Sequence, residues 1–288
     1  MVPQQPSSQN PLMNLMRQPK IYIQLPSKGQ YWDPGSIDVP ENGEYPVYSM
    51  TAQDELALKI PDALMNGQAI VDVVQHCMPN IKNAWKCPNL DLDVILVAIR
   101  IATYGEKMSV PITLGEYEAE YELDLRVLVD QLNSQITWDP VVPINSDVTV
   151  YIKPINYFVM SKTAIQSFET QKLIQLASDE SISDEQKVEM FKDSFAKLNK
   201  MTIGVINESV YQVDSAGGTV TNTQHIQEFM NNVDKSTFGK IKTHIDKLRE
   251  INSVKPLTIQ VNEEMRAQGV TQDTIEYPLN FDPTSFFV

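Results

Sequence analysis

The chain has 288 residues, a hydrophobic fraction of 42% and a charged fraction of 21%, which are ordinary values for a soluble globular protein. Its formal net charge of −14 argues against nucleic-acid binding, because no basic stripe compensates for the acidic balance. We expect no signal peptide, membrane span or lipid anchor, and the two cysteines, Cys77 and Cys87, are too few for a disulfide-stapled secreted domain. The composition predicts a protein of a reducing cytoplasm, or of a particle assembled there.

Residues 1–19 are rich in proline, glutamine, serine and asparagine, without hydrophobic periodicity. This composition is typical of a flexible arm. A second interpretation is an arm that becomes ordered on a partner, with Leu12 and Met16 among its anchors. Residues 21–25 then predict a short strand that is closed by the turn 26–29, and residues 31–35 predict another turn.

The next segments predict two helices after a short strand at 47–50. Thr51 and Asp54 have the spacing of a capping box, and the helix that they open must end by Pro61. A second helix, which Pro79 stops, places five apolar residues on one face. These residues are Ala69, Ile70, Val73, Val74 and Cys77.

The most apolar segment of the chain is residues 89–105, which we interpret as a helix buried on nearly all sides. Asn89 is a suitable N-cap, acidic residues follow it in the first turn, and Gly105 suits the C-terminal end. A buried strand is the competing interpretation, but the length and the capping residues favour a helix. Arg100 is the one polar residue between Val94 and Ala102, and such a residue either reaches the surface or meets a buried acid. If it meets an acid, we expect the partner to be Asp54 or Glu55.

The rest of the chain predicts a β-hairpin, a mainly helical region and two further strands. The hairpin covers residues 107–114 and 117–123, a short helix follows Asp124, and a strand lies at 148–152. Helices are expected at 155–178, at 183–198 running into the segment 201–213, at 222–231 and at 236–251. Strands are expected at 257–261 and 274–279.

These elements predict an α+β protein with four parts. Residues 1–19 form the arm, and residues 20–154 form a mixed domain around the buried helix at about 89–104. Residues 155–252 form a helical region. Residues 253–288 form the C-terminal strands and an aromatic tail, which either stand apart or pack back on the N-terminal domain.

We find no pattern that predicts catalysis or metal binding. There is no phosphate loop, dinucleotide fingerprint, nucleophile elbow or zincin helix. His76 and Cys77 with Cys87 form the one local cluster, and it lacks the paired cysteines of a zinc site, so buried structural cysteines are the simpler interpretation. We therefore predict no enzyme, no catalytic or metal-binding residue and no cofactor.

Several motifs resemble those of a family of baseplate hub proteins from contractile-tailed bacteriophages related to T4. Their order and spacing match over residues 20–135 and again at the end of the chain. The motifs are Leu25-Pro26-Ser27-Lys28-Gly29, Met50-Thr51-Ala52-Gln53-Asp54-Glu55, the run from Leu96 to Gly105, Leu123-Asp124-Leu125, and the segment from Phe281 to Phe287. Residues 155–250 match the family only in being helical.

The resemblance implies a structural protein of the virion tail baseplate that is assembled in the host cytoplasm. Its partners would be other hub or tail proteins, with no nucleic acid or membrane span, and self-association is left open. An alternative is an assembly chaperone that is absent from the mature particle. Relatives carry Cys-x-x-Cys pairs that suggest zinc knuckles, whereas this chain has no cysteine at those places, so no zinc role is carried over.

Three segments have an adhesive composition, because aromatic and methionine side chains are enriched at the cores of protein interfaces. They are the arm, the turn after residue 30 and the C-terminal end. Packing inside a local core is the alternative for the C-terminal end, and disorder is the alternative for the arm. The predicted partner-binding residues are Leu12, Met16, Tyr31, Trp32, Phe286 and Phe287.

Overall fold

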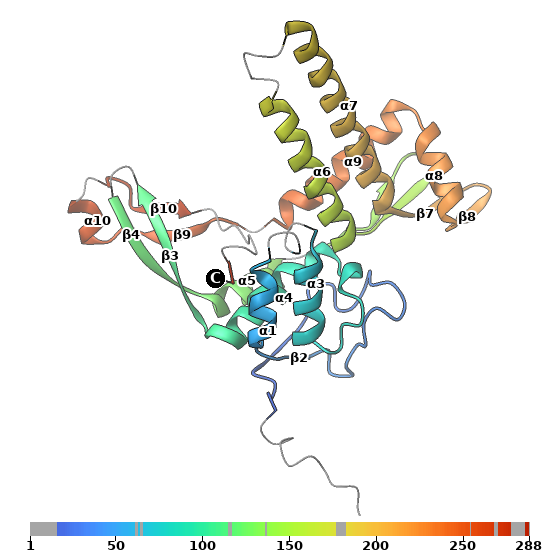
Figure 1. Ribbon diagram of the computed structural model, residues 1–288. Coiled ribbons are helices and arrows are strands. Elements are labelled where there is room, and N and C mark those ends of the chain that lie inside the picture. The colour runs from blue at the N-terminus through green and yellow to red at the C-terminus, as the bar shows by residue number, and fades with distance from the viewer. Residues whose placement is uncertain are drawn as a thin grey trace, which may run out of the picture.

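The computed structural model describes residues 16–60, 63, 66–114, 117–135, 137–176, 183–253, 255–267, 270–277 and 286–287. Figure 1 shows helices and small antiparallel sheets arranged in three directions around the N-terminal part of the chain. The predicted α+β class is confirmed, with strands near both ends of the chain. Predicted arm residues 1–15 lie outside the described residues.

The N-terminal part is a set of helices that pack around α4, with one small sheet beside them. The strands β1 (Ile21–Ile23) and β2 (Tyr45–Val47) pair antiparallel. The helices are α1 (Ala52–Leu58), α3 (Gln68–Cys77) and α4 (Asn89–Tyr104), with the 3₁₀ turn η2 (Ala84–Lys86) between the last two. The predicted capping box of Thr51 and Asp54 is present at the start of α1.

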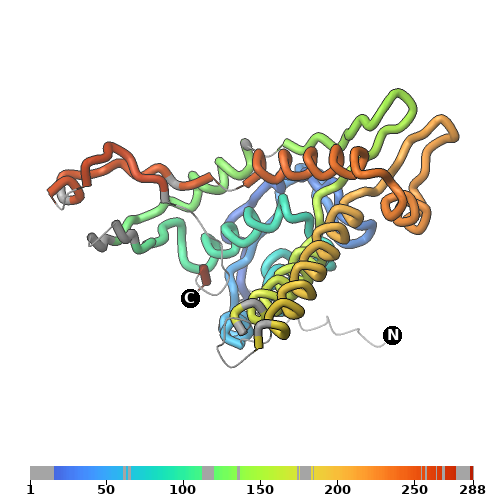
Figure 2. Tube along the Cα trace, turned by 90° about the horizontal axis from the view of Figure 1, so that it is seen from above, coloured from blue at the N-terminus to red at the C-terminus, as the bar shows by residue number. Residues whose placement is uncertain are grey.

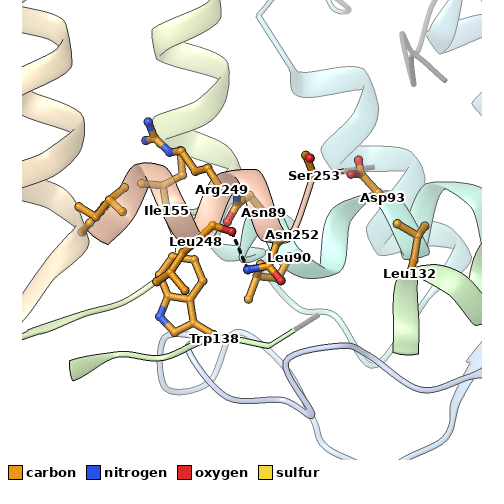
Figure 3. A pocket seen from close by; sticks show the side chains of 12 residues that line it. Asn89, Leu90, Asp93, Leu132, Trp138, Ile155, Leu248, Arg249, Asn252 and Ser253 are labelled. Atoms are coloured by element: carbon orange, nitrogen blue, oxygen red, sulfur yellow. Dashed lines mark hydrogen bonds between the residues drawn. The ribbon is translucent and has the colours of Figure 1, made fainter. Parts of the chain in front are cut away.

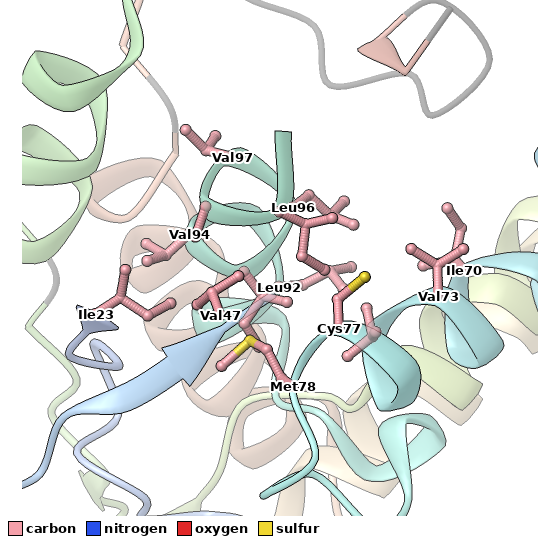
Figure 4. Packing of buried hydrophobic residues seen from close by; sticks show 14 of the residues in the cluster. Ile23, Val47, Ile70, Val73, Cys77, Met78, Leu92, Val94, Leu96 and Val97 are labelled. Carbon is pink, nitrogen blue, oxygen red and sulfur yellow. The ribbon is translucent and has the colours of Figure 1, made fainter. Parts of the chain in front are cut away.

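Helix α4 is the centre of the largest hydrophobic core (Figure 4). Val94, Ile95, Val97, Ala98 and Ile99 have no solvent exposure, and β1, β2, α3 and α5 cover the helix on different sides. The predicted buried helix is therefore confirmed. Since about 25 cal/mol is gained per Å² of apolar surface removed from water, a helix buried all round is a dominant contributor to stability.

The predicted N-cap of α4 was wrong by one residue. Pro88 is the N-cap and Asn89 is the first helical residue. The backbone N–H of Asn89 donates to the carbonyl of Ile155 at 2.9 Å. This N–H belongs to the first turn of the helix, where it has no partner within the helix, and a distant segment of the chain satisfies it. Tertiary pairing therefore decides where this helix begins.

Two hairpins extend together from one side of the N-terminal core (Figures 1 and 2). The first is the predicted one, and helix α5 follows it; the second lies near the end of the chain and encloses helix α10. Tyr121 packs against both the main core and a small cluster that includes Ile259 and Met265. The elements are β3 (Lys107–Leu114), β4 (Tyr117–Asp124), α5 (Leu125–Gln135), β9 (Leu257–Gln260), α10 (Glu263–Ala267) and β10 (Thr274–Tyr277).

A second core lies between a four-stranded antiparallel sheet, in the order β5-β6-β7-β8, and two helices. Its buried side chains include Val150 and Val213, which are paired in the sheet, and Ile241 and Ile245 of α9. The elements are β5 (Val141–Pro143), β6 (Thr149–Ile152), β7 (Val210–Ser215), β8 (Gly218–Val220), α8 (Thr223–Asn232) and α9 (Lys235–Ile251). Strands β5 and β6 thus pack with helices α8 and α9. The predicted domain boundaries stay a prediction.

The expectation that residues 201–213 continue a helix was wrong beyond Ser209. The chain enters β7 at Val210 and turns back into β8. Val210, Tyr211 and Val213 are residue types that favour strands, and pairing with β6 gives them a partner. The residues between β7 and β8 form the turn of a hairpin.

Helices α6 (Tyr157–Leu176) and α7 (Asp184–Ser209) lie side by side and project away from both cores (Figures 1 and 2). We call this pair the rod. Its base is fixed on the N-terminal core, where Tyr157 stacks on Trp85 with ring centroids 5.6 Å apart. Gly67 has φ +81°, and an added Cβ would lie 2.7 Å from the Ser161 hydroxyl, so the close approach of α6 requires glycine there.

Candidate interaction surfaces

The loop after β1 is attached to α4 through one buried carboxylate. Asp91 accepts hydrogen bonds from the Ser27 backbone N–H at 2.8 Å, the Ser27 hydroxyl at 2.5 Å and the Trp32 indole N–H at 2.8 Å. Burial raises the pKa of Asp91 to about 6, although these hydrogen bonds lower it. The loop 25–29, which resembled the phage family, and the turn 31–35 are therefore held on the buried helix by the same group.

The same loop has a strained backbone, and its side chains contact both cores. Lys28 and Tyr31 have positive φ values of 54° and 66°, which are uncommon for residues other than glycine. The Tyr31 ring packs edge-on against Trp138, with centroids 6.4 Å apart, while the neighbouring Trp32 points to Asp91. The adjacent side chains of Tyr31 and Trp32 thus contact different cores, and the loop packs against both of them.

A polar cluster holds the start of α1, the end of α3 and the segment that leads to the N-terminal arm. Asp54 accepts from Thr51 and lies 2.7 Å from His76 Nδ1. Burial by itself raises the pKa of Asp54, but the bonds from His76 and Thr51 hold it below its usual value. Arg17 donates to the carbonyls of Ser49 and His76, both at 2.5 Å. The cluster fixes the point from which the exposed Met16 leaves the core.

Arg100 binds the C-terminal segment and not the acidic partner that we expected. Within the described residues it forms no ion pair with Asp54 or Glu55. Its guanidinium donates to the Phe286 carbonyl at 2.5 Å and lies over the rings of Tyr104 and Phe286. The Tyr104 hydroxyl donates to the Phe287 carbonyl at 3.1 Å. The expected pairing was wrong because carbonyls and aromatic faces from far along the chain occupy this position.

A cavity with a volume of about 230 Å³, lined by both polar and apolar side chains, separates the start of α4 from α5 and the end of α9 (Figure 3). Asn252 is satisfied there, since it donates to the carbonyls of Leu248 and Thr137. Burial raises the pKa of Asp93 to about 6, and no described residue donates a hydrogen bond to its carboxylate. The contact between the two cores at this place is therefore incompletely filled and includes a carboxylate without a hydrogen-bond donor from the described residues.

The rod has several large apolar side chains on its outside. Phe158, Phe168 and Phe195 are 53%, 41% and 58% exposed, and Val188 and Ile203 are exposed as well. The buried side chains of the same helices include the hydroxyl residues Thr170 and Ser194. A helix pair that is stable by itself would bury its phenylalanines between the helices. This inverted pattern is typical of a surface that another chain covers.

The predicted partner-binding residues lie in different environments. Leu12 is outside the described residues, Met16 is 55% exposed, and Tyr31 is half-buried against Trp138. Trp32, Phe286 and Phe287 are buried side chains of the main core. The last two pack edge to face with centroids 5.3 Å apart. Their contact with partners stays a prediction, and in the isolated chain these three side chains serve the fold.

Sequence reasoning missed the exposed phenylalanines of the rod. The signal was present in residues 157–176, where apolar residues occur on every side of the helix and define no single stripe. Such a helix is either buried all round or covered by a partner. The polar composition of residues 155–252 as a whole concealed this local feature.

The structure also bears on metal binding, on the chemistry of the two thiols and on membrane-spanning helices. Within the described part of the chain, no three histidine, cysteine, aspartate or glutamate side chains gather closely enough to hold a metal ion. Burial raises the pKa of the Cys77 thiol to about 11 and raises that of Cys87 well above its usual value. Among the helices described, none has both the length and the apolar composition that crossing a bilayer requires.

Comparison with known proteins gives one result that covers most of the chain. A family model described as T4 bacteriophage base plate protein matches residues 19–265. No curated protein and no solved structure matches. The matched range includes most of the main core, the second core and the rod. The chain therefore belongs to the T4 bacteriophage base plate protein family.

Proposed function

We propose that this protein is a non-enzymatic structural component of the baseplate hub in a contractile phage tail, where it holds neighbouring hub or tail-tube proteins. The observation that carries the proposal is the rod, whose phenylalanines Phe158, Phe168 and Phe195 are 53%, 41% and 58% exposed. Membership of a base plate family makes other tail proteins the expected partners. The place of action is then the virion tail, after assembly in the host cytoplasm.

The chemistry of the polar groups supports binding over catalysis. Asp91 and Asp54 are both occupied by hydrogen bonds that hold helices and loops together. Burial keeps the thiols of Cys77 and Cys87 protonated near neutral pH, and a protonated thiol is a poor nucleophile. We assign no catalytic residue, metal or cofactor to the chain.

The two cores and the rod give the protein several contact surfaces at once. We assign the rod, the Met16 end of the arm and the loop around Tyr31 to partner contacts, since each presents an apolar or aromatic side chain at the surface. The net charge of −14 favours basic surfaces on at least some partners, and such attraction weakens as salt increases.

Quantitative mass spectrometry of purified particles tests this proposal against the chaperone alternative. A structural component is present in a fixed ratio to the tail-tube protein, which serves as the internal standard. Hub assembly intermediates from the same infected cells provide the comparison. Presence in the intermediates but not in mature particles would show a transient assembly factor and would overturn the proposed structural role.

A further inference from the structure

A groove runs along the rod between its two helices. It has a volume of about 520 Å³. Along α6 its lining residues recur at intervals of three and four residues from Phe158 to Leu173, a length of about 22 Å at 1.5 Å per residue. The groove is therefore straight, follows the helix axis and covers about four helical turns. Its other lining residues are Val159, Lys162, Thr163, Gln166, Glu169, Thr170, Lys197, Lys200, Met201, Gly204, Val205 and Glu208.

The floor of the groove includes a glycine that the fold of the chain does not require. Gly204 lies inside α7, where glycine costs about 1 kcal/mol relative to alanine. A Cβ placed on Gly204 would meet no atom within 4 Å, so no neighbour in the chain excludes a larger residue. The missing side chain leaves the helix backbone open to close approach from outside.

The charges of the groove differ from those of the chain. Lys162, Lys197 and Lys200 line it together with Glu169 and Glu208, whereas the whole chain has a net charge of −14. None of the three lysines forms an ion pair with a described residue. Cationic groups that pair with no described carboxylate in an acidic protein are complementary to an acidic ligand.

We propose that this groove binds an amphipathic α-helix of another tail protein, with an apolar stripe and carboxylates along its edges. Apolar side chains of the stripe would pack on Phe158, Leu173 and Met201 and approach the backbone at Gly204. Carboxylates of the partner would reach Lys162, Lys197 and Lys200. The straight groove of about four turns fits a helix laid between two helices. The inference rests on the proposed structural function and names the partner of the rod.

Two synthetic peptides provide the probe. Both are helical peptides of about four turns with leucines on one face; one carries glutamates along both edges and the other carries lysines. Fluorescence anisotropy with the purified full-length protein measures their affinities at low and at high salt. We expect saturable binding of the acidic peptide that weakens as salt increases, and at least about tenfold weaker binding of the basic peptide.

Matched variants locate the binding site. Lys200→Glu in the groove is paired with Lys192→Glu, which makes the same change at an exposed position of α7 outside the groove. Gly204→Gln is paired with Gly239→Gln, since both glycines lie inside helices and neither has an atom within 4 Å of an added Cβ. Both glutamine variants are expected to raise the melting temperature. Only Lys200→Glu and Gly204→Gln are expected to weaken the acidic peptide at least about tenfold.

Other results of the peptide and variant experiments overturn the proposal. Equal binding of the two peptides, no binding of either, or equal effects of the paired variants would remove the acidic helix as the occupant. Dimerisation of the free protein that Gly204→Gln abolishes, measured by sedimentation equilibrium, would assign the groove to a second copy of this chain. Binding of the acidic peptide by a protein that is absent from particles would leave this inference standing while contradicting the proposed structural role.

Discussion

At the residue scale, two carboxylates of the same helix have opposite surroundings. Asp91 accepts three hydrogen bonds, whereas no described residue donates to Asp93, and burial raises the pKa of both to about 6. An unfolded aspartate has a pKa near about 3.9, so the folded state binds protons more tightly. The contribution of both groups to stability is therefore greatest below pH about 4 and is lost as the pH rises to about 6.

Asp93→Asn removes the half-buried charge to which no described residue donates. We expect the free energy of unfolding at pH 7 to rise by about 1–3 kcal/mol, because a pKa shift of one unit corresponds to about 1.4 kcal/mol. The loss of stability between pH about 4 and 6 should also become smaller. Urea denaturation at pH 4, 5 and 7 measures both effects, with Asp130→Asn at an exposed position as the control. A variant that is less stable than the parent at pH 7 would contradict this account.

Trp32→Phe tests the attachment of the loop to α4. It keeps an aromatic ring but removes the indole N–H that donates to Asp91, and a buried charged group that loses one donor costs about 1–3 kcal/mol. Trp85→Phe is the control, since the structure gives its indole a stacking contact with Tyr157. Equal changes in the denaturation midpoint for the two variants would show that the Asp91 bond contributes nothing.

Arg100→Lys tests how the C-terminal segment is held. Lysine keeps the charge but loses the planar group that spans the Phe286 carbonyl and two aromatic rings, and we expect a loss of about 1–2 kcal/mol. The control is Arg126→Lys, whose exposed pair with Glu106 contributes about 0–1 kcal/mol. Thermal melting compares the two. Equal melting temperatures would place the stabilising contacts of this segment elsewhere.

At the element scale, the sequence predicted most helices and hairpins, because their periodicity and capping residues are local signals. Thr51 with Asp54, and the apolar face from Ala69 to Cys77, both appear in the structure as expected. The strand β7 was missed, since Val210 follows a long helix and is drawn into a strand by pairing with β6. Val210, Tyr211 and Val213 favour a strand, but the pairing with β6 that makes them one lies outside residues 201–213.

Ile99→Asp tests the central position of α4. Ile99 has no solvent exposure, and an unpaired carboxylate placed there costs several kcal/mol, a large share of the stability of a typical domain. We expect the variant to lack a cooperative melting transition by circular dichroism. Ile60→Asp, at a side chain that is 53% exposed, should melt like the parent. A folded Ile99→Asp protein would show that α4 is not the centre of the core.

At the scale of the whole molecule, the contacts that sequence reasoning could not supply are those between distant segments. Arg100 and Phe286 are separated by 186 positions, and their contact follows from the path of the chain and from no local motif. The burial of Trp32 and Phe286 likewise became visible only when the core was assembled. The exposed apolar surface of the rod was missed for a related reason. Whether Phe195 is exposed depends on which surfaces the rest of the folded chain leaves uncovered.

The central claim is that the protein acts by holding neighbouring tail proteins on its surface. The most direct measurement is complementation of a phage that lacks this protein with the variant Phe195→Ser, scored as infectious titre and as complete tails in electron micrographs. Phe195 is 58% exposed, so the purified variant should melt like the parent while tail assembly falls at least about tenfold. Val127→Ser, at an exposed site on α5, is the control that should assemble normally. A Phe195→Ser variant that supports normal titres and normal tails would contradict the claim.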